Sequence, residues 1–357
     1  MKKTKNSGKR VLAIGNEAVV RAALAAGATA FFGYPITPAT EIIALWPKYQ
    51  PKFKTKFLQT EDEPSAGFTL IGAVLAGAKA FTATAGPGTV LMQDAFSMAE
   101  AMRIPTVAVI VQRGGPSTGT VIYSQQEVLL TCFGGNGEGF RVVYSPSNLQ
   151  ELYDLTIQAF NTAWQYRFPT FVLTDGYLGK MRGLVEFYDP KKKRMKLVPP
   201  EPILLNPKKK KGTYVNMANC VNLEEDIFQI NEKIRKDFQK YRPQIEQYQE
   251  YKTKDAEILI IAHSIVGAAA QSAIDTLRQQ GIKVGLFRPI TLQPFPAKAA
   301  LQLAKSVKKI VIPESSVGQF IKIVKEALYG LKVPIQHYAR PALGITAEEI
   351  VALIKKK

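Results

Sequence analysis

The chain has 357 residues, a hydrophobic fraction of 46% and a formal net charge of +18 at pH 7. At roughly one domain per 100–200 residues, this length predicts two or three domains of a globular protein. No apolar run is long enough to span a bilayer, which excludes a membrane-spanning protein. The basic N-terminus leads straight into a strand-like segment without a secretory signal, so we expect a cytoplasmic location.

The few cysteines and histidines limit the metal chemistry of this chain. The sequence contains two of each, Cys132, Cys220, His263 and His337. Two cysteines far apart cannot ligate an iron–sulfur cluster alone, and they argue against a disulfide framework. Two histidines likewise argue against a histidine-rich metal site. We therefore expect no metal bound by this chain alone.

Much of the positive charge lies in runs, at the N-terminal lysines and at residues 191–194, 208–211 and 355–357. Such runs are usually solvated tails or loops. They can also attract an acidic partner protein, a phosphorylated cofactor or nucleic acid. No nucleic-acid motif accompanies them, so DNA or RNA binding is the weaker interpretation.

Strands and helices alternate over residues 1–185. Strands are expected at 11–14, 30–33, 56–59, 80–84, 106–111 and 171–174, and helices at 16–26, 40–46, 66–76 and 90–102. This alternation predicts an α/β domain with a doubly wound parallel sheet.

The composition changes over residues 186–254, which are rich in Pro, Lys, Asn and Gln and predict a basic connector. Apolar residues recur every three or four positions within 223–241, so the connector contains one amphipathic helix. A second α/β pattern predicts a smaller domain over residues 255–357. Its expected strands lie at 258–262, 283–287 and 309–312, and its helices at 268–280 and 318–328.

Four loops of the first domain follow strands and are expected to converge, because ligand crevices form outside the carboxyl ends of parallel strands. They are residues 34–38, 61–63, 86–88 and 113–119, and they supply a hydroxyl, a carboxylate, backbone donors and a guanidinium. Residues 86–88 lack the Lys-Ser/Thr of a phosphate-binding P-loop. No Gly-x-Gly-x-x-Gly follows the first strand, so the sequence does not support a dinucleotide site.

Two side chains in these loops have competing interpretations. Arg113 follows a buried strand and can grip a carboxylate through two parallel hydrogen bonds, or it can be solvated at the edge of a structural turn. Glu63 opens a helix, where a buried carboxylate is costly unless it is bonded. The alternative for Glu63 is a solvated carboxylate favoured by the helix dipole, a role that Glu61 and Asp62 can also fill.

Several segments together resemble the alpha subunit of 2-oxoacid:ferredoxin oxidoreductases. They occur in the family's order and cover nearly the whole chain. They are residues 33–38 (GYPITP), 61–63 (EDE), 82–88 (TATAGPG), 113–119 (RGGPSTG), 134–138 (GGNGE), 287–289 (FRP), 294–296 (PFP), Glu314, Gly318 and Gln319. The resemblance implies the pyrimidine-binding domain of a thiamine-diphosphate enzyme followed by a smaller domain like the C-terminal domain of transketolase.

The resemblance also implies roles for individual residues. Glu63 would bond the aminopyrimidine ring and promote loss of the thiazolium proton. Arg113 and Thr37 would contact the carboxylate and carbonyl of the substrate. Further positions implied at the substrate are Ser117 and Thr118, and further positions implied at the cofactor are Pro38, Gly86 and Gly88.

The implied reaction is the oxidative decarboxylation of a 2-oxoacid to acyl-coenzyme A and CO₂, with electrons passed to ferredoxin. The polar pair Ser117 and Thr118 favours 2-oxoglutarate over a branched-chain acid. The beta subunit of this family brings the diphosphate and Mg²⁺ site and an iron–sulfur cluster, and the resemblance leaves room for gamma and delta subunits. A complete thiamine enzyme needs Gly-Asp-Gly and a downstream asparagine, and the nearest approach here is Thr174-Asp175-Gly176.

The sequence departs from the family pattern at two places, and two alternative functions stay open. Pro64 follows Glu63 where the family often has an apolar residue, although proline is compatible with a first helical turn. The connector over residues 189–212 has no clear family match. The first alternative is a half-subunit of a non-oxidative thiamine-dependent lyase or transketolase. The second is a non-catalytic basic binding module.

Overall fold

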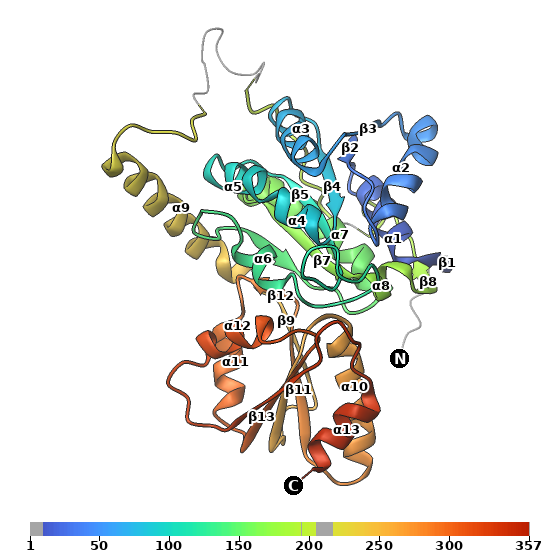
Figure 1. Cartoon of the computed structure of the whole chain (residues 1–357), viewed down its shortest axis with the longest axis vertical. Helices are drawn as coiled ribbons and strands as arrows, with labels where there is room; N and C mark the ends of the chain where they lie inside the picture. The colour runs from blue at the N-terminus through green and yellow to red at the C-terminus, as the bar shows by residue number, and fades with distance from the viewer. Residues whose placement is uncertain (1–9, 194, 205–216, 357) are drawn as a thin grey trace.

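The computed structural model describes residues 10–193, 195–204 and 217–356. These residues form two α/β bodies, one above the other, and a long helix leans away from the upper body (Figure 1). Two of the predicted basic runs, the N-terminal lysines and residues 208–211, lie outside the described residues. Among the described helices, none is both long and apolar enough to cross a membrane.

The upper body is built on a seven-stranded sheet, counted over the described residues, in the order β12-β6-β7-β5-β4-β2-β3. Neighbouring strands are parallel except for β12 and β6. The bounds are β2 (Ala30–Gly33), β3 (Lys56–Gln59), β4 (Ala80–Thr84), β5 (Val107–Gln112), β6 (Val142–Tyr144), β7 (Thr170–Asp175) and β12 (Thr291–Gln293). Residues of β4, β5 and β7 are buried throughout, as expected for parallel strands covered on both faces. The predicted α/β class is confirmed.

Helices cover both faces of this sheet. The neighbouring residues Phe31 and Phe32 of β2 show that the sheet separates two hydrophobic cores. Phe31 packs into the core under one set of helices, and Phe32 packs into the core under the other, because successive strand residues point to opposite faces. The first set is α1 (Gly15–Ala25), α2 (Thr40–Phe53) and α7 (Leu149–Tyr166). The second set is α3 (Glu63–Leu75), α4 (Pro87–Leu91), α5 (Gln93–Ala101) and α6 (Val128–Phe133).

Several elements differ from the sequence prediction, and three of them, β1, α2 and α3, lie near the predicted loops. Strand β1 (Arg10–Ile14) does not enter the sheet and instead pairs antiparallel with β8 (Arg182–Glu186), because its alternating burial suits a ribbon with one exposed face. Helix α2 continues through Pro47 and Pro51 to Phe53. Helix α3 already begins at Glu63, since the Asp62 side chain accepts a hydrogen bond from the Ser65 backbone N–H at 2.7 Å and caps it.

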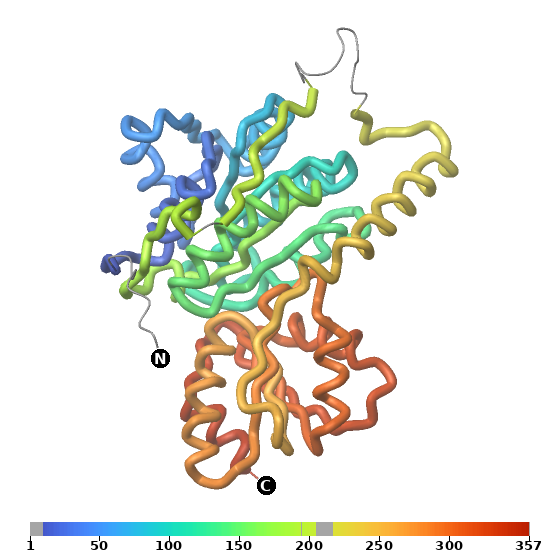
Figure 2. Tube along the Cα trace, turned by 180° about the vertical axis from the view of Figure 1, so that it is seen from behind, coloured from blue at the N-terminus to red at the C-terminus, as the bar shows by residue number. Residues whose placement is uncertain are grey.

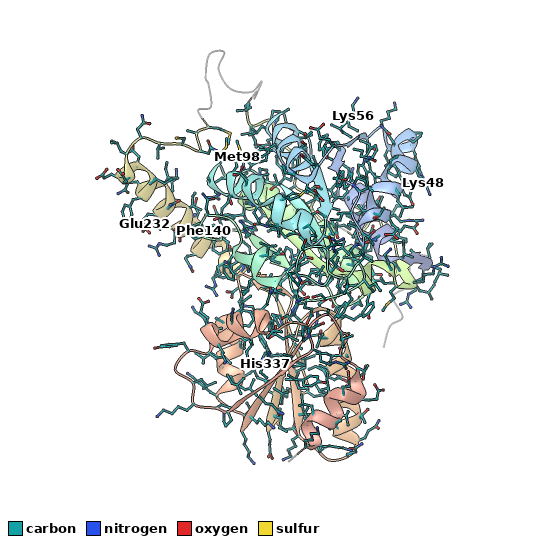
Figure 3. All side chains as sticks on the ribbon, viewed as in Figure 1. Lys48, Lys56, Met98, Phe140, Glu232 and His337 are labelled. Atoms are coloured by element: carbon teal, nitrogen blue, oxygen red, sulfur yellow. The ribbon has the colours of Figure 1, made fainter. Side chains whose placement is uncertain are left out.

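The lower body contains a second sheet of five described strands in the order β14-β13-β10-β11-β9, parallel except for β9. The strands are β9 (Tyr248–Tyr251), β10 (Ile258–Ile261), β11 (Val284–Pro289), β13 (Lys309–Glu314) and β14 (Ile335–Ala339). Helices α10 (Ser264–Gln279) and α13 (Ala347–Lys355) cover one face, and α11 (Ala297–Ala304) and α12 (Gln319–Ala327) cover the other (Figure 1). Within this body, Nε2 of His337 on β14 is hydrogen-bonded to Oε1 of the buried Glu314 at 2.7 Å (Figure 3).

The segment between the bodies contains α9 (Glu224–Ile245), four residues longer at its end than predicted. Its second half packs on the upper body through Ile234 and Phe238, while its first turns are exposed (Figure 2). Strand β12 lies within residues 255–357, which were predicted as the second domain, but it pairs with β6 of the upper sheet. Strand β9 of the lower sheet lies within residues 186–254, which were predicted as connector. The division at residues 185 and 254 therefore stays a prediction.

Candidate active site

Four predicted loops meet at one edge of the upper sheet, because they follow the parallel neighbours β2, β3, β4 and β5. Arg113 Nη1 donates to the backbone oxygen of Thr37 at 2.8 Å, which joins the loops after β5 and β2. A Cβ atom placed on Gly86 would lie 2.6 Å from Arg113 Nε. A Cβ atom on Gly88 would lie 2.7 Å from Glu63 Oε1. The folded chain thus brings together the carboxylate, the guanidinium and both glycines.

Glu63 is 5% exposed at the first position of α3. Burial raises the pKa of its carboxyl, and the charge of Asp62 adds to this effect, while the Glu63 backbone amide and Arg113 oppose it. Within the part of the chain that the structure describes, no other side chain donates a hydrogen bond to this carboxylate. The helix-capping role falls to Asp62, so Glu63 is a buried acid that accepts a hydrogen bond only from its own backbone amide among the described residues.

Arg113 is also 5% exposed, so it is not solvated at the rim of a turn. Its Nη1 is bonded to Thr37, but its buried Nε has no hydrogen-bond partner in the described residues. The side chain packs directly against Gly86, whose φ of +52° and missing Cβ permit this approach. The Nε and Nη2 donors therefore have no hydrogen-bond partner among the described residues, and such a pair can donate two parallel bonds to a carboxylate.

The remaining predicted site residues differ in their surroundings. Thr37 is half-buried, and its Oγ1 lies 3.3 Å from Thr40 Oγ1. Pro38 is buried, and its carbonyl accepts a hydrogen bond from Asn16 Nδ2 at 2.8 Å. Ser117 and Thr118 are exposed, and their side chains make no hydrogen bond to any described residue.

The sequence prediction missed Glu127, a buried carboxylate behind the loops. Its Oε1 accepts the backbone N–H groups of Gly86 at 2.9 Å and Arg113 at 3.0 Å. Its Oε2 accepts the Thr89 hydroxyl at 2.6 Å. Burial raises the pKa of this carboxyl, and the three donors oppose the shift. The only signal in the sequence was an acid placed directly before the apolar run at residues 128–130.

Asp175, the residue nearest to a Gly-Asp-Gly motif, has a structural role. It ends β7, caps the short helix α8 (Gly176–Lys180) by accepting from Leu178 N at 2.9 Å, and accepts from Ser264 Oγ of the lower body at 3.2 Å. Burial raises its pKa to about 6. Among the described residues, no group of three His, Cys, Asp or Glu side chains is arranged to hold a metal ion.

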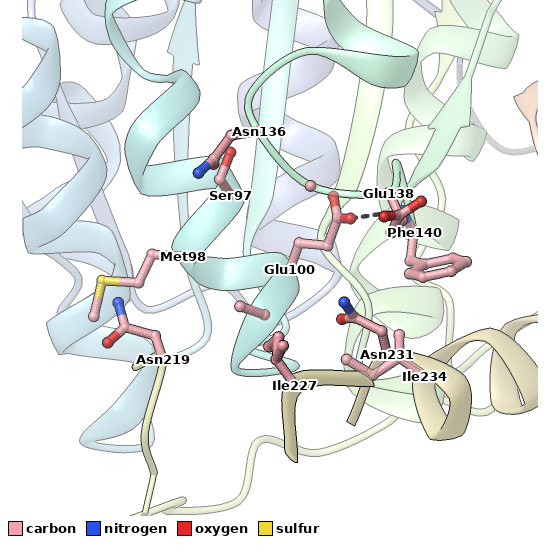
Figure 4. Close-up of a pocket in the computed structure, with 12 residues that line it drawn as sticks. Ser97, Met98, Glu100, Asn136, Glu138, Phe140, Asn219, Ile227, Asn231 and Ile234 are labelled. Carbon is pink, nitrogen blue, oxygen red and sulfur yellow. Dashed lines mark hydrogen bonds between the residues drawn. The ribbon is translucent and has the colours of Figure 1, made fainter. Parts of the chain in front are cut away.

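Two hollows lie near these elements. One, of about 530 Å³, lies at the end of β3 and the start of α3 and is lined by residues that include Leu58, Glu61, Pro64 and Phe68, but by neither Glu63 nor Arg113. The other, of about 280 Å³, lies between α5, the loop at residues 136–140 and α9, away from the four loops (Figure 4).

The carboxyl end of the parallel sheet thus holds a buried glutamate, a buried arginine and glycine turns. A family model described as "Pyruvate flavodoxin/ferredoxin oxidoreductase, thiamine diP-bdg" matches residues 21–250. A second, described as "Pyruvate:ferredoxin oxidoreductase core domain II", matches residues 256–348. The chain belongs to the family of alpha-type subunits of 2-oxoacid:ferredoxin oxidoreductases, as the sequence motifs predicted.

Curated relatives differ in their named substrates. The ketoisovalerate oxidoreductase subunit VorB of Methanothermobacter thermautotrophicus is 36% identical over 321 residues, covering 88% of each chain. The 2-oxoglutarate synthase subunit KorA of Methanocaldococcus jannaschii is 34% identical over 329 residues, covering 85% of this chain and 88% of the relative.

Two solved structures share the fold. The 2-oxoglutarate:ferredoxin oxidoreductase from Magnetococcus marinus superposes with a TM-score of 0.88 and 25% identity over 98% of this chain, which spans only 65% of that chain. A split-gene transketolase superposes with a TM-score of 0.59 and 14% identity over 96% of this chain and 95% of that chain, which shows the fold alone.

Proposed function

We propose that this chain forms the pyrimidine-binding half of a thiamine-diphosphate site that oxidatively decarboxylates a 2-oxoacid to acyl-coenzyme A and CO₂, with two electrons passing to ferredoxin. The observation that carries the proposal is the proximity of two buried groups among the described residues, Arg113, whose Nε has no hydrogen-bond partner, and Glu63, whose carboxylate accepts no hydrogen bond from another side chain. Buried charges without partners are costly, so they are expected where a ligand completes them.

The cofactor proposal rests on Glu63 and the glycine turn. When bound, thiamine diphosphate supplies the carbon nucleophile and the electron sink that decarboxylation needs. Glu63 would hold a proton at the pyrimidine ring, since burial raises its pKa toward the range of an acid–base group. Pro38, Gly86 and Gly88 would line the same space. Gly88 has no room for a Cβ, because Thr84 Oγ1 would lie 2.1 Å from it.

The substrate proposal rests on Arg113 and Thr37. The Nε–Nη2 edge of Arg113 would bind the carboxylate next to the 2-oxo carbon, and the Thr37 hydroxyl would donate to the 2-oxo oxygen. Ser117 and Thr118 are exposed in the same loop and would meet the far end of the substrate. A polar far end fits 2-oxoglutarate, the acid named for KorA and for the Magnetococcus enzyme. The relative VorB makes a branched-chain acid the alternative.

A partner subunit would complete the site with the diphosphate and Mg²⁺ ligands and with an iron–sulfur cluster. The subunit names of the relatives support a hetero-oligomer. So do exposed apolar side chains beside the four loops, among them Leu58, Phe68, Val90 and Leu91. Coenzyme A and ferredoxin would be the other reactants, gamma and delta subunits would be further partners, and the cytoplasm would be the location. The proposed division of the chain is residues 1–185, 186–254 and 255–357.

The test is reconstitution. The chain would be purified alone and together with a co-expressed beta subunit, each with thiamine diphosphate, Mg²⁺ and coenzyme A. We expect 2-oxoacid-dependent ferredoxin reduction by the complex and none by the chain alone. Turnover by the chain alone contradicts the half-site. CO₂ release without electron transfer supports a non-oxidative lyase, and faster turnover of 2-oxoisovalerate than of 2-oxoglutarate overturns the substrate assignment.

A further inference from the structure

The buried carboxylate of Glu127 holds two active-site loops in a fixed relation. One of its oxygens accepts both the N–H of Gly86, two residues after β4, and the N–H of Arg113, directly after β5. Its other oxygen accepts the hydroxyl of Thr89 at the start of α4. The Glu127 side chain thus connects the turn at Gly86, which faces Glu63, to Arg113.

Glu127 is itself held from the lower body. Gln319, the first residue of α12, donates from Nε2 to the backbone oxygen of Gln126 and accepts from the backbone N–H of Leu129 at 3.1 Å. Beside it, Gln125 and Ser315 exchange two hydrogen bonds, at 3.1 and 3.0 Å. Residues 125–129 are therefore fastened to the start of α12 on both sides of Glu127.

We propose that Glu127 is a positioning residue for 2-oxoacid binding, which sets the distance and orientation of Arg113 relative to the Gly86 turn, and that Gln319 extends this control to the lower body. This inference rests on the proposed function, because it assigns Arg113 to the substrate. Glu127 lies behind the loops and touches no reactant, so it acts through Arg113 and Gly86.

The geometry explains why a carboxylate serves here. The N–H groups of Gly86 and Arg113 converge on a single oxygen, and both lie where strand pairing has ended, so no neighbouring strand supplies an acceptor. A glutamine keeps a carbonyl oxygen for both donors and can donate to Thr89 in return. An alanine removes all three bonds, and an aspartate is one methylene too short to reach them together.

The experiment uses the assembled complex with its partner subunit and compares E127A, E127Q, E127D and Q319A. Kinetics are expressed per thiamine-loaded site, so that unfolded protein does not contribute. We expect E127A and E127D to raise the KM for the 2-oxoacid about tenfold and to lower kcat/KM roughly 10- to 100-fold, since small misplacement of reacting groups is costly. We expect E127Q to stay within about threefold of wild type, Q319A to be intermediate, and the KM for coenzyme A to change little in each variant.

E100Q is the matched control. Glu100 is equally buried and accepts a backbone N–H from Phe140 at 2.9 Å (Figure 4), but it pairs with Arg141 away from the four loops. The E100Q variant should lower the unfolding temperature of the complex without raising the KM for the 2-oxoacid. If E127A behaves like E100Q, Glu127 is only structural and the proposal is wrong.

Two other outcomes are also decisive. If E127A does not assemble, E127D decides the matter: an unchanged KM for the 2-oxoacid overturns the proposal, and a raised one supports it. A wild-type complex that oxidises no 2-oxoacid overturns the proposed function itself, whereas an active wild type with silent variants overturns only the role of Glu127.

Discussion

The carboxyl edges of the two sheets carry the same kinds of charged groups in opposite bonding states. At the upper edge, Arg113 uses one donor and Glu63 has no side-chain partner. At the lower edge, Arg288 of β11 is 2% exposed and bonds Glu151 through two nitrogens, at 3.0 and 2.7 Å, as well as Gln249. Two sheets of similar topology therefore differ at their carboxyl edges, and unused hydrogen-bonding capacity distinguishes the edge proposed as the active site from the other one.

Glu314 in the lower body and Glu63 in the upper body differ in the same way, in how many hydrogen bonds their carboxylates accept. Glu314 ends β13 and is fully buried, and it accepts from Phe320 N at 2.8 Å, from Ile321 N at 3.3 Å and from the Ser316 hydroxyl, with His337 as a further partner. Glu314 thus accepts the backbone N–H groups at the start of α12, whereas Glu63 is the first residue of α3, and Asp62 caps that helix. A saturated carboxylate at a helix start stabilises the fold, whereas an unsaturated one is free for a ligand.

The largest expected effect comes from Glu63→Gln. Glutamine is nearly isosteric but cannot take up or release the proton, and positioned acid–base groups contribute roughly 10²–10⁴-fold. Proton exchange at the thiazolium carbon, followed by NMR in the assembled complex, should slow by that factor with little change in unfolding temperature. The Glu314→Gln variant is the control and should lose stability instead. Unchanged exchange in Glu63→Gln would reassign Glu63 to the fold.

Arg113→Lys should have the second largest effect. Lysine keeps the charge but loses the planar fork, so the substrate is bound more weakly and less well oriented. Hydrogen bonds to charged groups contribute about 1.5–3 kcal/mol, which corresponds to a ten- to hundredfold loss in kcat/KM. Steady-state kinetics and melting temperature would be measured on the same purified complex. Wild-type kcat/KM would show that the substrate carboxylate is bound elsewhere.

Arg288→Met tests the lower edge. It removes the bonds to Glu151 and Gln249, and we expect the free energy of unfolding to fall by about 2 kcal/mol. Denaturant unfolding of the complex measures this loss, and kcat/KM per loaded site should be almost unchanged. A large kinetic defect without a loss of stability would erase the contrast between the two edges.

Asp175, which joins the two bodies, should give the smallest effect, a pH dependence. Its folded-state pKa is raised from 3.8 to about 6 by burial, so ionised Asp175 weakens the fold above pH 6, and the penalty is relieved as the pH falls from about 6 toward 3.8. Asp175→Asn should therefore be more stabilised relative to wild type at pH 7.5 than at pH 5, by about 1 kcal/mol. Chemical denaturation at both pH values measures the difference. An equal difference at both would show that Asp175 does not titrate in this range.

Local patterns predicted the elements and the site to different degrees. The buried strands β4, β5 and β7 were found from their apolar runs, and the four loops followed from the strand ends, whereas the three-residue strand β6, also buried throughout, was missed. Helix α7 was missed, although it is amphipathic, because Tyr153, Thr156 and Thr162 interrupt the apolar residues of its buried face. The hydrogen bonds of Arg113 to Thr37 and of Glu127 to Gly86 join residues far apart in the sequence. No local pattern encodes such contacts, so Glu127 could not be recognised as a positioning residue from its neighbours.

The placement of β12 has a consequence for synthesis of the chain. The outer edge of β6 is closed by residues 291–293, which are made long after the rest of the upper sheet. During translation, β6 therefore presents unpaired backbone groups until the first three strands of the lower body have been made, and exposed strand edges of this kind invite pairing with other chains. A gene cut between the two bodies would make that exposure permanent.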